Sequence, residues 1–182
     1  MKGRQALRAG VLLAAALIAG QAFGQAQMRT TGIGGVSDRA AKPGSDKNFN
    51  PTNTNDPFNR GLAAYDSGDF KLAERMFDEV LAESPNDAVV LVLSGMSMSG
   101  RGDYKSARKQ FDHALRSDRQ NLDAHREMGI ALAKTNDAKG AQEQLAWLKS
   151  KQAACATKCE DAGKLDRAVS AVETAITPPK AG

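Results

Sequence analysis

A repeat of 34 residues is the feature that most constrains how this chain of 182 residues can fold. Three sets of residues recur at that spacing: the glycines Gly61, Gly95 and Gly129, the alanines Ala73, Ala107 and Ala141, and the bulky residues Phe77, Phe111 and Leu145. A turn signal keeps the same register, as Gly-Asp at 68–69 and 102–103 and as Asn-Asp at 136–137. A period of this length is typical of stacked helix pairs, because one pair cannot bury its apolar face alone. We therefore expect an all-α chain.

These repeats resemble those of the tetratricopeptide repeat (TPR) family. The family pattern has a small residue in the first helix, Ala-x3-Phe in the second and often a proline after it. The first repeat carries Gly61, Ala73, Phe77 and Pro85, whereas the third has Ala138 in place of the turn aromatic. The resemblance covers residues 57–150. It implies an α-solenoid of about three helix pairs, with repeats at about 54–87, 88–121 and 122–155.

The residues after the third repeat predict a capping helix over 164–176. One stripe of this segment is apolar, formed by Leu165, Ala168, Val169, Val172 and Ile176. A polar outer face would end the stack, and Pro178 would end the helix. Residues 151–177 are therefore interpreted as a cysteine-containing turn and cap, and 178–182 as a tail. We expect Trp147 to pack near the cap; the alternative is an exposed contact for a partner.

The first 24 residues have the layout of a secretory signal peptide. Lys2, Arg4 and Arg8 precede an apolar run, Val11–Ala19, and small residues follow it. Cleavage after Gly24 or after Ala26 fits the pattern. The run is shorter than the ~20 residues that span a bilayer, so an uncleaved anchor is the weaker interpretation. We expect an exported protein, in the periplasm or, as the alternative, secreted, with no transmembrane segment in the mature chain.

The net charge of the chain depends on whether this signal peptide is counted. The full sequence has 25 Lys and Arg against 21 Asp and Glu, a formal charge of +4. Without residues 1–24 the balance is 22 against 21, and no block of like charge remains. Nucleic-acid binding needs a concentrated basic surface, so it is not expected.

Residues 25–56 predict a flexible leader between the signal peptide and the repeats. Gly, Thr, Asn, Ser and Pro make up 16 of its 32 residues, and its apolar residues are isolated. Such a segment buries too little apolar surface to offset its chain entropy. Gly32-Ile33-Gly34-Gly35 resembles the start of a phosphate loop, but Ser37 stands where the third glycine is needed.

The TPR resemblance implies that a peptide or protein segment binds the concave face formed by the first helices. In the family register the candidate residues of this face are Leu62, Tyr65, Val92, Met96, Ser99, Arg126 and Ile130. Because Val89–Leu93 is apolar all round, we hypothesise an apolar groove around Val92, Met96 and Ile130. The alternatives are that the short array closes on itself or that residues 25–56 fold back over the groove.

Some TPR domains hold a C-terminal carboxylate with Lys, Asn and Arg on this face. Here those places are taken by Phe58, Leu62, Asp123 and Glu127. A clamp of that kind is therefore not expected.

Cys155 and Cys159 are the two cysteines of the chain. In an oxidising compartment we expect them to form a disulfide. In a straight helix, residues four apart have Cβ atoms about 5–6 Å apart. A disulfide needs about 3.5–4.5 Å, so pairing requires the third repeat to end near residue 155. Thiol–disulfide exchange, a metal site with His113 or His125, and free thiols are the alternatives.

No catalytic motif, metal site or cofactor site is expected from the sequence. Residues 95–99 resemble the Gly-x-Ser-x-Gly motif of a nucleophile elbow, but Ser99 stands in place of the final glycine. The sequence therefore favours a non-enzymatic interaction module, an adaptor or assembly factor of the bacterial cell envelope, binding a partner of unknown identity. The alternatives are a periplasmic thiol-redox protein that uses Cys155 and Cys159, and a self-associating scaffold.

Overall fold

The structure is a computed structural model that describes residues 55–155 and 159–177. Every regular element in these residues is an α-helix, which confirms the all-α prediction. The helices are α2 (Pro57–Asp66), α3 (Phe70–Glu83), α4 (Ala88–Gly100), α5 (Tyr104–Ser117), α6 (Leu122–Lys134), α7 (Ala138–Cys155) and α8 (Ala162–Ile176). The predicted signal peptide, nearly all of the predicted leader and the predicted tail lie outside the described residues.

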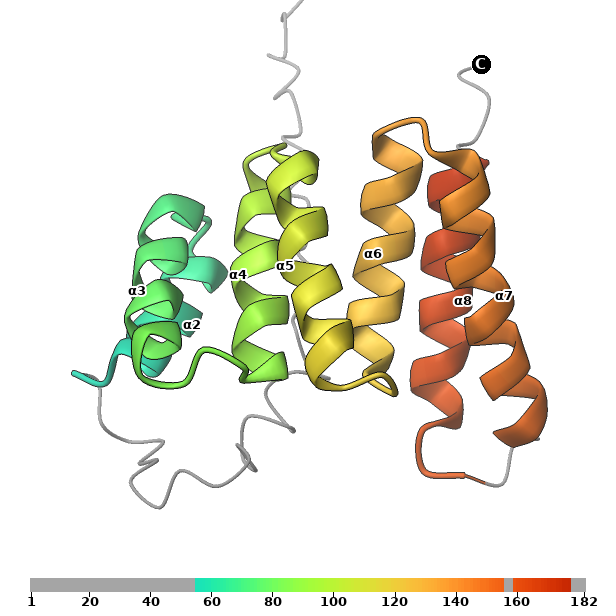
Figure 1. Ribbon diagram of the computed structural model, residues 1–182, viewed down its shortest axis with the longest axis horizontal. Helices are drawn as coiled ribbons and strands as arrows, with labels where there is room; N and C mark the ends of the chain where they lie inside the picture. Colours follow the sequence, from blue (N-terminus) through green and yellow to red (C-terminus); the bar gives the residue numbers. More distant parts are fainter. Residues whose placement is uncertain (1–54, 156–158, 178–182) are drawn as a thin grey trace, which may run out of the picture. The chain divides into compact units, whose positions relative to one another are not determined.

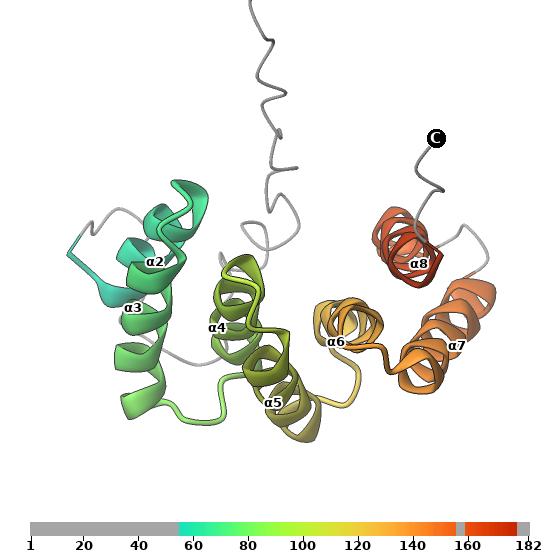
Figure 2. The same cartoon turned by 90° about the horizontal axis from the view of Figure 1, so that it is seen from above.

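The helices form three pairs and a final single helix, as the 34-residue period predicts. Helix α2 packs on α3, α4 on α5, and α6 on α7, while α3 contacts α4 and α5 contacts α6. Figure 1 shows the pairs following one another in chain order. In Figure 2, α2, α4 and α6 lie along one side of the row and α3, α5 and α7 along the other. Helix α8 packs against both α6 and α7, which is the position predicted for a cap.

Aspartate or asparagine side chains begin most of these helices. Asp56, Asp69, Asp87, Asp103 and Asn121 are N-caps whose side chains accept hydrogen bonds from backbone N–H groups of the first turn. At α5, for example, the carboxylate of Asp103 accepts from the backbone N–H of Ser106 at 3.1 Å, and this hydrogen bond lowers the pKa of Asp103. Each cap satisfies a donor that has no partner within the helix.

The turns inside the pairs require a left-handed backbone. Gly68 and Gly102 have φ values of 81° and 82°, a region that glycine enters without steric cost. In the third repeat Asn136 takes the same place with φ of 60°. Asparagine tolerates this region better than most residues that carry a Cβ atom. The Gly-Asp and Asn-Asp signals are therefore the same turn in three copies.

The periodic glycines let an aromatic ring lie directly on a helix backbone. A Cβ atom at Gly61 would lie 2.5 Å from Phe77 Cε1, and one at Gly95 would lie 2.5 Å from Phe111 Cε1. Both rings are fully buried. Each also belongs to a cluster that includes residues of the following repeat, such as Leu93 for Phe77 and Met128 for Phe111. The aromatic position therefore fills the space within a pair and between neighbouring pairs.

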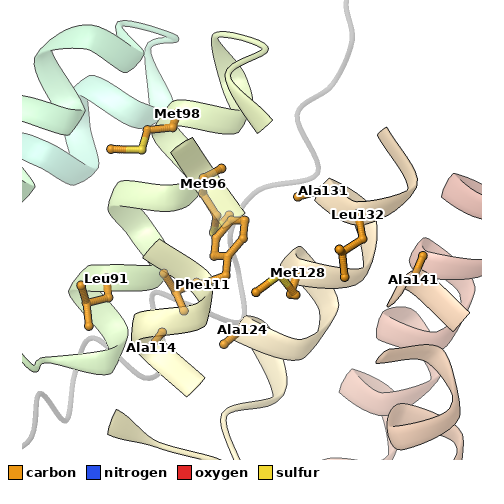
Figure 3. Packing of buried hydrophobic residues seen from close by; sticks show 12 residues of the cluster. Leu91, Met96, Met98, Phe111, Ala114, Ala124, Met128, Ala131, Leu132 and Ala141 are labelled. Carbon is orange, nitrogen blue, oxygen red and sulfur yellow. The ribbon is translucent and has the colours of Figure 1, made fainter. Parts of the chain in front are cut away.

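Helix α4 is buried on all sides along most of its length. The nine residues from Val90 to Met98 are all buried, although two of them are serines. Figure 3 shows Leu91, Met96 and Met98 of α4 in one cluster with Phe111 and with residues of α6. This agrees with the expectation that a helix apolar all round needs cover on both sides.

Candidate interaction face

The seven residues predicted from the family register lie on α2, α4 and α6, the first helices of the three pairs. We call these residues the inner face: Leu62, Tyr65, Val92, Met96, Ser99, Arg126 and Ile130. Val92 and Met96 are buried, with 3 % and 9 % of their surface exposed, and the other five are half-buried. Val92 and Met96 of α4 are therefore more deeply buried than the other five residues of the inner face.

The structure divides the apolar residues of this face between clusters. Val92 and Met96 lie in the cluster of Phe111 and Met128, and Tyr65 packs against it. Ile130 packs against a different cluster, formed by α7, α8 and Leu122 of α6. The apolar surface of the inner face is therefore centred on Val92 and Met96 of α4, with Tyr65 of α2 packed against the same cluster.

A charged group on α6 borders this apolar surface. The guanidinium of Arg126 donates through Nε to Glu127 Oε1 at 2.8 Å, and its Nη1 lies 3.0 Å from Asp123 Oδ1. The side chains are largely enclosed, with 24 % of Arg126 and 14 % of each carboxylate exposed. Burial alone would lower the pKa of Arg126, but the charges of Glu127 and Asp123 outweigh it and raise the pKa above its ordinary value. One arginine between two carboxylates leaves the group with a net negative charge.

The charges of Glu127 and Arg126 on α6 act on the pKa of Tyr65, which lies on α2. Burial raises the pKa of the Tyr65 hydroxyl to about 12, the negative charge of Glu127 adds to the shift, and Arg126 opposes it. The ring of Tyr65 packs edge-on against Phe70, with 5.3 Å between ring centroids. The inner face therefore combines a neutral phenol, an apolar centre and an acidic border.

The cysteines lie at the other end of the array. Cys155 and Cys159 form a disulfide with 5.4 Å between their Cα atoms. Helix α7 ends at Cys155, as the pairing prediction required, and α8 begins at Ala162. The disulfide therefore joins the last repeat to the turn before the cap.

The two histidines pack between elements. His113 Nε2 lies 3.0 Å from Asn86 Oδ1. His125 stacks on Trp147 with ring centroids 3.5 Å apart, and its two nitrogens meet Gln144 Oε1 and the carbonyl oxygen of Arg119. Trp147 packs against the cluster of α7 and α8, as predicted, but nothing in the sequence pattern indicated the stack with His125. Among residues 55–155 and 159–177, no group of three or more His, Cys, Asp or Glu side chains is arranged to hold a metal ion.

Within the described part of the chain, no helix has the length and apolar character needed to cross a bilayer. No protein-family model matches the sequence, and no curated protein matches it.

The structure resembles solved structures, among them the crystal structure of the Sgt2 TPR domain from Aspergillus fumigatus. The match has a TM-score of 0.55 and 20 % sequence identity, and it covers 69 % of this chain and 80 % of that one. At this identity the likeness concerns the fold alone. It confirms the TPR-type α-solenoid predicted from the 34-residue period.

Proposed function

We propose that this chain is a non-enzymatic interaction module that binds a peptide or protein segment on the inner face. The observation that carries the proposal is the juxtaposition on α2, α4 and α6 of an apolar centre with a charged border. Apolar side chains of a segment would pack toward Met96, and its polar groups would meet Tyr65 and the carboxylates beside Arg126. A surface of this kind favours binding through side chains.

The N-terminal sequence supports an exported location for this module, in the periplasm or outside the cell. A positive segment, a nine-residue apolar run and small residues follow one another in residues 1–26. We therefore propose an adaptor or assembly factor of the cell envelope. Detection of a mature chain that begins at residue 25 or 27 in an envelope fraction would support this location, and an unprocessed cytoplasmic chain would contradict it.

Peptide selection tests the binding function without a known partner. The folded chain is used to select peptides from a random library, and the affinity of the selected peptides is measured by calorimetry. Ser99→Arg puts a long cation on the inner face, where Ser99 is half-buried. Ala82→Arg puts the same side chain at an exposed position of α3 and is the matched control.

We expect Ser99→Arg to weaken binding of the selected peptides at least tenfold and Ala82→Arg to leave it unchanged. Circular dichroism must show that both variants keep the fold. Equal affinity of both variants for every selected peptide would disprove binding at the inner face. Crosslinking pull-down from the envelope with the native chain and with Met96→Glu then identifies the cellular partner. Because Met96 is buried, that variant is informative only beside Ser99→Arg.

A further inference from the structure

Helix α4 is buried more deeply than its equivalents in the neighbouring repeats. Met96 is 9 % exposed, whereas Leu62 and Ile130, which occupy the same register on α2 and α6, are half-buried. Helices α3, α5 and α6 pack around α4, and the remaining side of α4 turns toward the inner face. Around this buried helix, the half-buried side chains of Leu62, Tyr65 and Ile130 leave apolar surface on the inner face that a docked segment would cover.

We propose that residues 31–54 of the same chain bind along the inner face and cover α4. The reach of the segment is sufficient. Twenty-four residues span up to about 80 Å when extended, and adjacent packed helices are about 8–10 Å apart. The segment leads directly into the N-cap of α2, so its effective concentration at the face is on the order of millimolar.

The chemistry of the segment complements the face. Its apolar side chains are few and separated, so they gain burial only on a surface that already exists. The large ones are Ile33, Val36 and Phe49, and the small ones are Ala40 and Ala41. Its charged residues are three cations, Arg39, Lys42 and Lys47, and two anions, Asp38 and Asp46. The segment is therefore net positive, opposite in sign to the group of Arg126, Asp123 and Glu127.

A regulatory role for the docked leader rests on the proposed function, the binding of a partner segment to the inner face. If the leader lies on the inner face, a partner segment must displace it, and the leader acts as a competing ligand within the same molecule. A leader with an intrinsic Kd of about 0.1 mM, present at about 1 mM, would weaken the apparent affinity for a partner roughly tenfold.

Photocrosslinking in the full chain tests the docking directly. A photoreactive amino acid replaces Ser99 on the inner face, and in the matched control it replaces Ala146, an exposed residue of α7. We expect crosslinks from position 99 to peptides within residues 31–54, in products with the mass of a single chain. The control position should give no such crosslinks. Products that join two chains, crosslinks only to the helices, or no crosslinks from position 99 would each overturn the proposal.

A leader variant separates this inference from the proposed function. Residues 31–54 are replaced by a Gly-Ser sequence of equal length, and the selected peptides are measured on both chains. We expect peptide affinity to rise about tenfold and hydrogen exchange of α4 amides to become faster in the variant. Unchanged exchange and affinity would refute the docked leader while the peptide-binding function stands. Crosslinks to the leader in the native chain, together with no peptide binding to the variant, would refute the binding function while the docked leader stands.

Discussion

The ring of Phe111 occupies the space where a side chain at Gly95 would begin. A Cβ atom at Gly95 would lie 2.5 Å from Phe111 Cε1 and 2.8 Å from Cδ1, far closer than van der Waals contact. Phe77 and Gly61 repeat this relationship one unit earlier, with the same distances. The recurrence of the pair explains why the glycines and the aromatic residues share one period.

Gly95→Ala is therefore expected to destabilise the fold. Alanine favours a helix over glycine by up to about 1 kcal/mol, but overpacking a filled core costs about 1–3 kcal/mol. Because Phe111 is fully buried and its ring cannot move aside into solvent, we expect a net loss of about 1–2 kcal/mol in the free energy of unfolding. Urea denaturation followed by circular dichroism measures this change.

The matched control is Gly163→Ala in α8. There the nearest atom to an added Cβ is Arg167 Nη1 at 3.5 Å, which is ordinary contact. Stability should stay the same or rise by up to about 1 kcal/mol. If both substitutions had the same effect, the close approach of Phe111 to Gly95 would not be what requires glycine.

The turn of the third repeat gives a second prediction, about Asn136. Its φ of 60° suits glycine better than asparagine, and Gly102 holds the equivalent turn with φ of 82°. Asn136→Gly should therefore be neutral or stabilising by up to about 1 kcal/mol, and Gly102→Ala destabilising by about 1–2 kcal/mol. Thermal unfolding of the two variants checks the opposite signs. A loss of stability in Asn136→Gly would show that the asparagine side chain is itself needed there.

The local features of the fold could be predicted because each depends on residues close in sequence or on the repeat. The turns at Gly68 and Gly102, the end of α7 at Cys155 and the capping helix α8 all follow from local signals. The repeat then fixes which helices pair, because each unit must bury the same apolar stripe against the next.

The candidate site was less accessible to prediction, because it depends on side chains that differ between repeats. The register placed all seven inner-face residues on the first helices, but it could not show that Ile130 packs toward the cap. Nor could it show the opposing charges around Arg126 acting on Tyr65, which lies two repeats away. In the third repeat the ring is absent, and a Cβ at Gly129 would instead meet Val172 of α8 at 2.9 Å.

A third prediction concerns the two buried serines of α4. Ser94 Oγ is buried without a hydrogen-bond partner among the described residues, whereas Ser97 Oγ donates to the carbonyl oxygen of Leu93 at 2.9 Å. Burying an unpaired hydroxyl costs about 1–3 kcal/mol, so Ser94→Ala should raise stability by about 1 kcal/mol. Ser97→Ala loses a hydrogen bond while gaining helix propensity, and it should change stability by less than about 0.5 kcal/mol. Chemical denaturation of the pair tests the difference; a stabilising effect confined to Ser97→Ala would contradict this account.

The disulfide is expected to act locally. Cys155 and Cys159 are four positions apart, and closing so short a loop stabilises a fold by at most about 2 kcal/mol. In the variant Cys155→Ser/Cys159→Ser we expect faster hydrogen exchange in the first turns of α8 and unchanged exchange in α3. Mass spectrometry with and without reductant establishes the pairing in the native protein. Exchange that rises equally in α3 and α8 would mean that the disulfide stabilises the whole array.

A final prediction follows from the raised pKa of Tyr65 and concerns alkaline pH. The pKa is about 12 in the folded chain, because of burial and the charge of Glu127, against about 10 in an unfolded chain. Between these values the unfolded state loses the proton first, so the stability contribution is intact below pH 10 and falls as the pH rises toward 12. Because the ring keeps some contact with water, the loss should be well under the roughly 2.7 kcal/mol that two full pKa units represent. Tyr65→Phe should flatten this fall, which denaturation midpoints across that range would show.

In Tyr104→Phe the only tyrosine left is Tyr65, and its absorbance titration should have a midpoint well above pH 10. An ordinary midpoint near 10 in the folded chain would show that Tyr65 is not held in the enclosed, negatively bordered site that the inner face provides.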